Sequence, residues 1–598
     1  MIERRTCQNC KKAFIIEPED FSFYEKICVP PPTWCWQCRA MRRMSHRNMH
    51  YLYKRICAAT GKTIFTLLPP KAPMPVYSRT YWASDAWDAA SYAMDYDFNR
   101  PFFEQIRDLY HAVPWTPPFC HDAVNSEYCQ AAWVKNCYLC FDTGFVEDSA
   151  YSVTLHHSKQ CLDTINCESC ELCYYCINTN SSYKTFFSRN CTSCIEVWCS
   201  QDCIGCTNCF GCTGLRNKNY HIFNKPYTKD AYTKALIEMK LDSWAGLQKA
   251  RREAAHIWAA YPVKYRHSVR ATDCTGDYLY NADKLRNCFF AGNAQNCANS
   301  QSIIYGPIKD SMDATSCGVA VELFYETICS GVNSSRVFFS FDTESVAECQ
   351  YVINCSQSND LFGCVGLRSK QYCILNKQYS KEAYGLLKQK IIEHMSAMPY
   401  TDAQRRVYAY GEFFPPDMSP YGYGETQAYE YFPLKKEQAV SQGFRWQEPE
   451  WRNYAATKSA ANLPETIGAA QDDILESVVR CLHDEAGGHF GQCAANCATA
   501  FRIIPEELRF YRKMHLPLPR LCFNCRHFER VAWRNAPILH PGKCACLSHE
   551  AITKAGAYKN TATHPHGNIP CTEVFETSYA PEQPEIVYCE NCYNAEVA

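Results

Sequence analysis

The sequence predicts a mainly β protein with additional helices. Two tandem β-solenoid-like modules, each capped by a helix, are expected between duplicated N- and C-terminal zinc-ribbon-like domains. Three observations predict this fold. Similar cysteine arrays lie near both ends of the chain, a second duplication fills the centre, and short strand-forming runs recur there at a step of 12 residues.

The composition is that of a globular chain with several domains. The 598 residues are 47% hydrophobic and 21% charged. No stretch approaches the roughly 18 apolar residues of a membrane span, and residues 1–14 lack the apolar core of a signal peptide. We therefore expect a cytoplasmic protein without a membrane partner. The formal net charge of -1 provides no overall attraction to nucleic acid, so any such affinity has to be local.

The two cysteine arrays predict a zinc ion near each end of the chain. In a reducing compartment, cysteines serve as metal ligands or small buried side chains rather than as disulfides. Paired cysteines on two knuckles supply the four soft ligands that tetrahedral Zn²⁺ prefers. The first array is Cys7, Cys10, Cys35 and Cys38, and the second is Cys493, Cys497, Cys522 and Cys525. The second array departs from the first, since its first pair has C-x3-C spacing where the first array has C-x2-C.

The residues between the cysteine pairs also match, which indicates that ligands and packing were duplicated together. The matching residues are Phe14, Ile16, Pro18, Phe23, Tyr24, Lys26, Pro30 and Pro32 in the first copy and Phe501, Ile503, Pro505, Phe510, Tyr511, Lys513, Pro517 and Pro519 in the second.

The central duplication predicts two modules of stacked short strands. A signature over 210–232 recurs over 362–384. Upstream of it, strand-forming runs are separated by Asn, Asp, Ser and Gly, as in a solenoid in which each coil stacks its inward residue on the coil before. The expected inward residues are Cys137, Ser149, Cys161 and Cys173 in module 1 and Cys288, Ser300, Met312 and Phe324 in module 2. A β-sandwich is the alternative.

Most cysteines of module 1 are expected to be packing residues. Their module 2 counterparts include Phe324 and Leu361, which cannot bind a metal. The run Cys199, Cys203, Cys206, Cys209 and Cys212 is the exception, because it also suits a soft metal.

These patterns divide the chain into nine segments. A helix is expected from Lys229 to about Ala260 and another from Lys381 to Met395, each capping the end of a module. An aromatic connector is expected to dock on module 1. The segments are a zinc-binding ribbon-like domain (1–62), the helical connector (63–119), module 1 (120–225), a capping helix (226–262), module 2 (263–377), a second capping helix (378–410), an extended aromatic wrapping segment (411–480), the second zinc-binding domain (481–540) and a C-terminal Cys/His zinc-binding segment (541–598).

The C-terminal segment predicts a further zinc ion with an ambiguous ligand set. Cys589 and Cys592 form a knuckle, and two of the other candidates complete the site. The candidates are Cys544, Cys546, His566, Cys571, Cys589 and Cys592, with His564 either a ligand or a polar loop residue. The chain is thus expected to hold two or three Zn²⁺ ions.

Arginines follow the last ligand of each large array at helical spacing. The stripes are Arg39, Arg43 and Arg47 in the first copy and Arg526, Arg530 and Arg534 in the second. A step of four residues places them on one side of a helix, where guanidinium groups could contact phosphates of RNA, DNA or a ribosome. The alternative is a solvated face, or arginines that pair with acids of an adjacent module.

Four segments together resemble a family of uncharacterised, cysteine-rich bacterial zinc-ribbon proteins. They are YGEFFPPDMSP (410–420), FGCVGLRSKQYCILNKQY (362–379), FRIIPEELRFYRK (501–513) and YAPEQPEIVYCENCY (579–593). The resemblance covers nearly the whole chain. It implies zinc binding and no particular activity.

Three functions compete. The first is a non-enzymatic zinc-binding scaffold that presents a rigid solenoid surface to a macromolecular partner. The second is nucleic-acid or ribosome binding through the arginine stripes, and the third is thiol redox chemistry or metal storage in the run from Cys199 to Cys212. The sequence contains no phosphate-binding glycine loop, nucleophile elbow or H-E-x-x-H motif, which makes an enzyme the less favoured class. The sequence does not identify the partner, the biological process or the oligomeric state.

Overall fold

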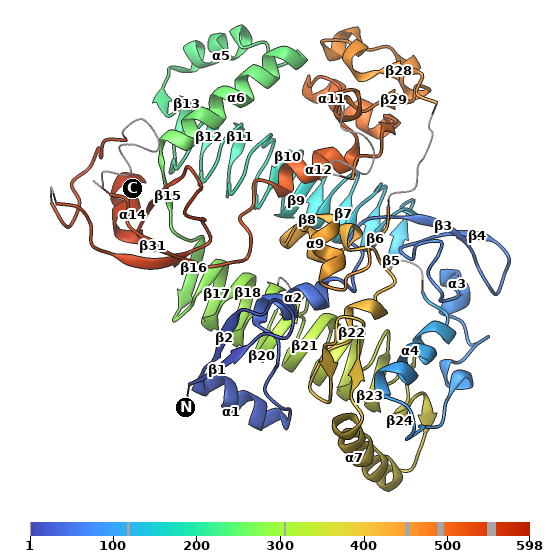
Figure 1. Cartoon of the computed structure of the whole chain (residues 1–598). Coiled ribbons are helices and arrows are strands. Elements are labelled where there is room, and N and C mark those ends of the chain that lie inside the picture. The colour runs from blue at the N-terminus through green and yellow to red at the C-terminus, as the bar shows by residue number, and fades with distance from the viewer. Residues whose placement is uncertain are drawn as a thin grey trace. The chain divides into compact units, whose positions relative to one another are not determined.

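The computed structural model describes residues 2–116, 120–303, 306–448, 455–486, 496–546, 558–567 and 569–597 (Figure 1). The chain forms two compact units, which we describe separately. Unit 1 comprises Met1–Pro118, Arg266–Gln447 and Ala536–Leu539, and unit 2 comprises Phe119–Tyr265, Glu448–Asn535 and His540–Ala598. Both units mix helices with many short strands.

Each unit combines one cysteine-rich end of the chain with the module that is more distant in sequence. Unit 1 contains the N-terminal four-cysteine segment and module 2, whereas unit 2 contains module 1 and both C-terminal cysteine segments. Within residues 411–480 the chain passes from unit 1 to unit 2 between residues 447 and 448. The expected wrapping segment (411–480) is therefore two segments, one in each unit.

Module 1 is a stack of strands in unit 2 that are parallel except for its last pair. Its six-stranded sheet has the order β10-β9-β8-β7-β6-β5, and paired residues such as Leu162 and Tyr174 lie one predicted repeat apart. The strands are β5 (Cys120–Val124), β6 (Gln130–Lys135), β7 (Phe141–Glu147), β8 (Val153–Lys159), β9 (Leu162–Glu168), β10 (Tyr174–Ile177), β11 (Ile195–Trp198), β12 (Thr207–Phe210), β13 (Asn219–Ile222) and β14 (Lys225–Pro226).

The stack has a period of three residues within each repeat, which the sequence analysis missed. From Tyr151 to Asp202 every third residue has a φ between 48° and 57°. Among residues other than glycine, Asn and Asp tolerate this left-handed conformation best, and here Asn166, Asn178 and Asn190 form a ladder with side-chain distances of 3.2 Å. Each of these turns points the next small residue inward. Every third residue from Ser149 to Cys212 is a buried Cys, Ser, Thr, Val or Leu.

Module 2 is a ten-stranded sheet in unit 1 with the order β16 to β25. Its strands are β16 (Ser268–Thr272), β17 (Gly276–Arg286), β18 (Cys288–Ala298), β19 (Gln301–Ile303), β20 (Ile308–Thr315), β21 (Val321–Gly331), β22 (Ser334–Gln350), β23 (Ser356–Phe362), β24 (Gln371–Ile374) and β25 (Lys377–Gln378). All neighbours up to β24 are parallel, and β25 turns back as an antiparallel strand.

The predicted inward column of module 2 holds from Cys288 to Ser300 and is wrong beyond it, because the step is not constant there. Ala314 N–H donates to Ser300 Oγ across 14 residues, and Phe324 N–H donates to Ser311 Oγ across 13. The column that ends at Phe324 therefore runs through Leu285, Cys297 and Ser311. Met312 lies one position further and receives the Tyr24 hydroxyl of the N-terminal segment on its sulfur.

A helical segment follows each module. After module 1 the predicted single helix is two helices, α5 (Lys229–Glu238) and α6 (Trp244–Ala260), because Ser243 caps a new helix by accepting from Gly246 N–H. After module 2, α7 spans Lys381–Ala397 and is capped by Ser380. A side-chain oxygen at the cap satisfies an amide that has no partner within the helix.

The aromatic connector docks on module 2, not on module 1 as predicted. It contains β4 (Thr63–Thr66), α3 (Arg79–Trp82), η1 (Ala89–Tyr92) and α4 (Phe102–Ala112), and β4 pairs with β3 (Tyr53–Ile56) of the preceding segment. The Phe102 ring lies 5.1 Å from Tyr351 and 5.4 Å from Phe362, both of module 2. Later in unit 1, β26 (Tyr400–Thr401), β27 (Val407–Tyr408), η2 (Pro416–Met418), η3 (Tyr423–Glu425), α8 (Gln427–Tyr431) and α9 (Lys436–Ser441) are short elements between buried aromatics.

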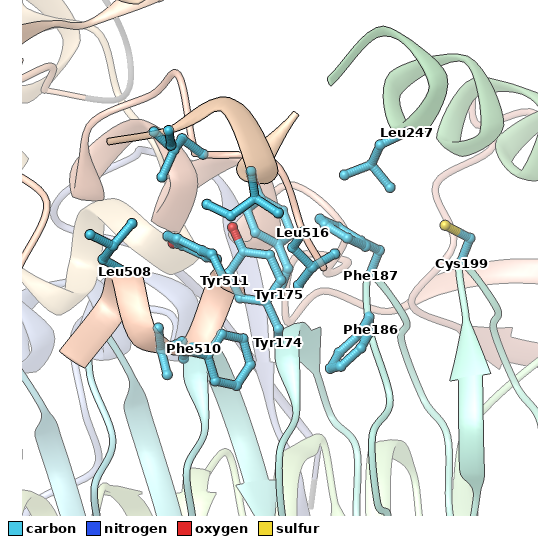
Figure 2. Close-up of a cluster of buried hydrophobic side chains, with 14 of the residues drawn as sticks. Tyr174, Tyr175, Phe186, Phe187, Cys199, Leu247, Leu508, Phe510, Tyr511 and Leu516 are labelled. Carbon is cyan, nitrogen blue, oxygen red and sulfur yellow. The ribbon is translucent and has the colours of Figure 1, made fainter. Parts of the chain in front are cut away.

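The main apolar cluster of unit 2 joins module 1 to the second four-cysteine segment (Figure 2). Tyr174 of module 1 packs 5.8 Å from Phe510 and 5.6 Å from Tyr511 of α11 (Pro505–Met514). Phe187 and Leu247 belong to the same cluster. Burial of these aromatic and aliphatic side chains stabilises the contact by roughly 1.5–3 kcal/mol for each residue fully removed from water.

Among the described residues, no helix combines the length and the apolar composition that crossing a membrane requires.

Candidate metal centres and arginine contacts

The first four-cysteine group has the predicted ligands. Cys7 and Cys10 lie between the antiparallel strands β1 (Glu3–Thr6) and β2 (Ala13–Ile16), and α1 (Pro18–Ile27) follows them. Cys35 caps helix α2 (Trp36–Met44), and Cys38 lies in its first turn. The four sulfur atoms lie within 4.8 Å of one another, and Cys10 and Cys35 are 3.8 Å apart. These four thiols could hold one metal ion.

The second group contains Cys481 together with three predicted ligands. Cys481, Cys497, Cys522 and Cys525 place their sulfur atoms within 4.8 Å of one another. Two of the sulfur pairs, Cys481 with Cys525 and Cys497 with Cys522, are 3.9 Å apart. Cys493 lies outside the described residues.

A strand signal could have identified Cys481. It directly follows β29 (Val479–Arg480), which pairs with β30 (Ala500–Phe501) as β1 pairs with β2. The first knuckle of the second copy is thus split by an insertion, which includes α10 (Leu482–Glu485). β28 (Lys458–Ser459) pairs with the other edge of β29. Cys522 caps α12 (Phe523–Val531) as Cys35 caps α2.

Each of these groups has the chemistry of thiols that share protons. Contacts from Cys35 and Cys38 lower the pKa of Cys7, and contacts from Cys35 and Cys7 raise the pKa of Cys38. In the second group, Cys497, Cys522 and Cys525 lower the pKa of Cys481. One thiolate is favoured because neighbouring thiols donate to it, and further ionisation requires a cation to balance the charge.

The C-terminal segment forms two groups instead of the predicted one. Cys544, Cys571, Cys589 and Cys592 form one, and Cys546, His564, His566 and Cys592 form the other. All six predicted ligands belong to one or both groups, and His564 is added. The residues come from the ends of β31 (His540–Lys543) and β33 (Ile586–Tyr588), from the loop before β32 (Val574–Thr577), and from α14 (Glu590–Val597).

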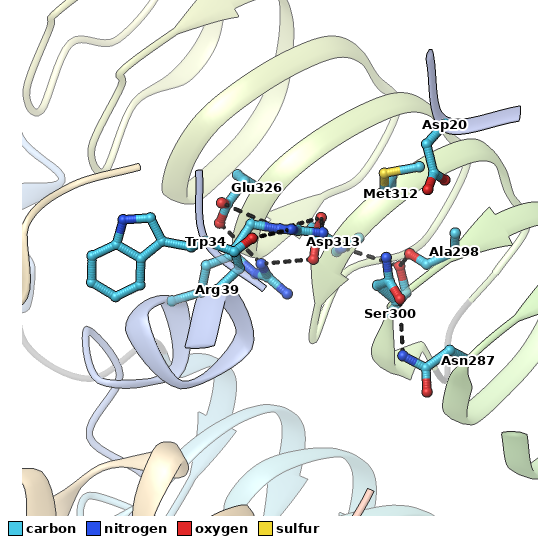
Figure 3. A network of polar contacts seen from close by, with 12 residues as sticks. Asp20, Trp34, Arg39, Asn287, Ala298, Ser300, Met312, Asp313 and Glu326 are labelled. Atoms are coloured by element: carbon cyan, nitrogen blue, oxygen red, sulfur yellow. Dashed lines mark hydrogen bonds and ion pairs between the residues drawn. The ribbon is translucent and has the colours of Figure 1, made fainter. Parts of the chain in front are cut away.

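The arginines of α2 enter a buried ion network with module 2 (Figure 3). Arg39 Nε donates to Asp313 at 2.9 Å, and Arg43 Nη1 donates to Asp313 at 3.1 Å and to Glu326 at 2.9 Å. Arg42 bridges Glu326 and Glu412, each at 2.8 Å. Burial disfavours the charged form of Glu326, but Arg42, Arg43 and Arg39 outweigh it and lower the pKa of that carboxyl.

The arginines of α12 form the corresponding contacts with module 1 in unit 2. Arg526 Nε and Arg530 Nη1 donate to Asp163 at 3.2 and 3.0 Å. Arg526 also donates to Glu507 of α11 at 3.2 Å. Burial raises the pKa of Glu507 more than Arg526 lowers it.

This burial removes most of the predicted phosphate-binding surface. Arg39 and Arg526 are 3% exposed, and Arg43 and Arg530 are 0% exposed. Only Arg47 and Arg534 of the six are partly accessible. The four buried guanidinium groups follow the alternative interpretation, in which arginines pair with acids of an adjacent module.

The cysteines of the run 199–212 do not form one cluster. Cys199 packs among the aromatics of the main apolar cluster, whereas Cys203, Cys206, Cys209 and Cys212 line the interior of module 1. Interior thiols donate to backbone carbonyls, as Cys212 does to Phe210 at 3.3 Å. Burial raises the pKa of Cys199 to about 12. None of the four-ligand groups found among the described residues includes a cysteine of this run.

A groove of about 610 Å³ lies beside the first four-cysteine group in unit 1. The one carboxylate in its described lining is Glu412. That side chain accepts from Thr33 N–H at 3.1 Å and from Arg42 at 2.8 Å. These contacts hold the Glu412 side chain between the Thr33 backbone and Arg42.

Comparisons with known proteins assign no family to the chain. No family model matches the sequence, and no curated protein matches it. A crystal structure from Desulfovibrio desulfuricans G20, provisionally named an acetyltransferase, is 11% identical with a TM-score of 0.10. The match covers 41% of this chain and 63% of that chain, so this chain matches less than two thirds of the other protein.

Proposed function

We propose that the chain is a non-enzymatic zinc-binding scaffold that presents β-solenoid surfaces to a macromolecular partner. The groups that begin with Cys7 and with Cys481 would each bind one Zn²⁺ as a zinc ribbon. The C-terminal segment would bind zinc as well. Each module would be a solenoid with 12-residue coils, lengthened by one or two residues in part of module 2.

One observation supports this proposal most directly. Helices α2 and α12 both begin at a cysteine of a four-cysteine group, and the arginines that follow enter a buried ion network with a module. Cys35 and Cys38 precede Arg39 and Arg43, just as Cys522 and Cys525 precede Arg526 and Arg530. An ion bound at the thiols would fix the start of the helix. The arginines then have fixed positions opposite Asp313 or Asp163. Such sites have a structural role and no open coordination position.

A ladder of exposed rings supports a role in presenting a surface. On module 1, Trp133 stacks on Phe145 at 4.6 Å and Phe145 stacks on His157 at 4.8 Å, with the rings within 9° of parallel. Trp133 and Phe145 are each 49% exposed. Aromatic side chains are enriched where proteins bind partners, and their spacing is fixed here by the coil step.

The scaffold proposal is tested by metal analysis and partner capture. Purified full-length chain is expected to contain zinc, and rigorous chelation is expected to expose α2 and α12 to proteolysis. Capture from native cells, with and without nuclease, is expected to enrich a nuclease-resistant partner that the Trp133→Ala/Phe145→Ala variant loses. Ile195→Ala, which changes an exposed residue outside the ladder, is the matched control. A zinc-free chain, or one whose form is unchanged after chelation, would overturn the proposal.

A further inference from the structure

The structure points to a two-metal cluster in the C-terminal segment, in which one thiolate, that of Cys592, binds both ions. This inference rests on the proposed zinc-binding function and extends it, because one ion was expected here. The first ion would take Cys544, Cys571, Cys589 and Cys592. The second would take Cys546, His564, His566 and Cys592.

The number of donors supports two ions. The two groups contain seven different side chains and have only Cys592 in common. A tetrahedral Zn²⁺ accepts four ligands, so a single ion would leave three of these donors unused. Two ions that share one thiolate use all seven, with four ligands for each ion. The thiolate and imidazole donors match zinc and other borderline divalent metals.

The distances fit the edges of two tetrahedra. Zn–S bonds of about 2.3 Å and Zn–N bonds of about 2.0 Å place neighbouring ligands roughly 3.5–3.8 Å apart. In the first group Cys571 and Cys589 are 3.9 Å apart. In the second group Cys546 lies 3.2 Å from His564 Nδ1 and 3.3 Å from His566 Nε2. His566 Nε2 is also 3.3 Å from Cys592, which joins the two groups.

Both histidines have their second ring nitrogen held by an acceptor. His566 Nδ1 lies 2.7 Å from the carbonyl oxygen of Ile569, and His564 Nε2 lies 2.7 Å from Glu596 Oε1. A carbonyl or carboxylate oxygen accepts a hydrogen bond, so these nitrogens carry the protons. The lone pairs of His566 Nε2 and His564 Nδ1 then face Cys546. This arrangement is the usual outer shell of metal-bound histidine.

Helix α14 places the shared ligand and one of the outer-shell acceptors. Cys592 lies in its first turn, and Glu596 follows one turn later on the same side. Backbone and side-chain donors also serve the sulfur atoms, since Cys589 N–H lies 3.2 Å from Cys544 Sγ and Asn560 Nδ2 lies 3.0 Å from Cys546 Sγ. Five thiolates around two divalent ions leave a single negative charge, which such donors stabilise.

The test counts metal ions by native mass spectrometry of full-length chain loaded with Zn²⁺. We expect four ions: one in the group that begins with Cys7, one in the group that begins with Cys481, and two in the C-terminal segment. His564→Ala and His566→Ala are each expected to retain three ions. Cys592→Ala is expected to retain two. Cys120→Ala, which changes a thiol outside every group, should retain four.

A second measurement applies if a variant fails to fold. After replacement of zinc by ¹¹³Cd in the unaltered chain, two of the cadmium signals are expected to show scalar coupling to each other, because they share a sulfur atom. A maximum of three ions with uncoupled signals, unchanged in His566→Ala, would overturn the cluster and leave the scaffold proposal intact. Absence of zinc from Cys7, Cys10, Cys35 and Cys38 and from the Cys481 group would instead contradict the scaffold proposal.

Discussion

Helix α2 of unit 1 and helix α12 of unit 2 contact their modules in the same way, except at one pair of positions. In both units an aspartate in a left-handed turn of the module, Asp313 or Asp163, accepts from two arginines one helical turn apart. The next turn of the stack differs. Unit 1 places Glu326 against Arg42, whereas unit 2 places Tyr175 against Glu529.

This difference indicates that the contact between each helix and its module depends on matched pairs of residues. The helix residue and the module residue have both changed, so each unit retains a complementary contact. In unit 2 the Tyr175 hydroxyl donates to Glu529, and Arg530 lies over the Tyr175 ring at 4.9 Å. In unit 1 a carboxylate takes the place of that ring and pairs with Arg43 as well as Arg42.

Loss of a bound metal ion is expected to have the largest effect on either helix. Cys38→Ser is expected to release α2, and Cys525→Ser is expected to release α12, since structural zinc supplies on the order of 10 kcal/mol of apparent binding free energy. Hydrogen exchange of the two helices, read separately by mass spectrometry, checks this. Each variant should deprotect its own helix. Equal protection in both variants and the unaltered chain would contradict a structural role for the thiols.

Replacement of the corresponding aspartates, Asp163 and Asp313, should have the next largest effect. Asp163→Asn and Asp313→Asn each leave buried arginines with less negative charge, which typically reduces the free energy of unfolding by about 3–5 kcal/mol. We expect Asp163→Asn to be the more destabilising, because Arg43 keeps Glu326. Chemical denaturation measures both. Asp88→Asn, which breaks an exposed pair with Lys370, should change stability by less than about 1 kcal/mol.

Exchange of the differing pair sharpens the comparison. Glu326→Tyr alone leaves Arg42 facing a ring and should destabilise unit 1. With Glu412, the other partner of Arg42, also changed to Gln in every variant, the double variant Arg42→Glu/Glu326→Tyr copies the pair of unit 2 and should recover part of that loss. A coupling free energy of about 1–3 kcal/mol is expected from the double-mutant cycle. Strict additivity of the two substitutions would show that the positions act independently.

The smallest expected effect is a pH dependence of the stability of unit 1 that is caused by His46. Burial, followed by Arg42, lowers the pKa of His46 to about 3, and Trp533 occupies the corresponding place in unit 2. The folded state binds fewer protons than the unfolded state below pH 6.5. The contribution of His46 is therefore fully present above pH 6.5 and is lost as the pH falls toward 3.

Between pH 6.5 and pH 5 this loss is about 2 kcal/mol. Asp342, whose pKa burial raises to about 6, acts in the opposite direction, so the measurement compares the unaltered chain with His46→Trp. Hydrogen exchange of α2 should depend less on pH in the variant. The same slope in both chains would remove His46 as the cause.

The sequence predicted those parts of the fold that depend on local pattern. The positions of Cys7, Cys10, Cys35 and Cys38 on two knuckles were enough to bring them together. The 12-residue step agrees with the parallel pairing from β7 to β10 of module 1, where paired residues lie 12 positions apart. The step failed in module 2, where paired residues between β18 and β22 lie 13 or 14 positions apart, so a count of 12 no longer identifies the residues of one column.

Long-range contacts could not be predicted from local pattern. Nothing near Arg39 indicates that its partner is Asp313, since an acid in a left-handed turn resembles any other turn residue until the coils stack. The interpretation of the arginines as a phosphate-binding stripe depended on that missing information. Cys481 was missed for a related reason, because the insertion after it separates the ligand from its knuckle.

The pairing of each chain end with the distant module has a consequence for biosynthesis. Arg39 and its acceptor Asp313 are 274 residues apart. At the usual elongation rates of 5–20 residues per second, the N-terminal helix waits about 14–55 s for its docking site to leave the ribosome. Throughout that interval Arg39 and Arg43 lack the acids of module 2 with which they pair in the folded unit. Early metal capture would keep this nascent segment compact until the matching coils emerge.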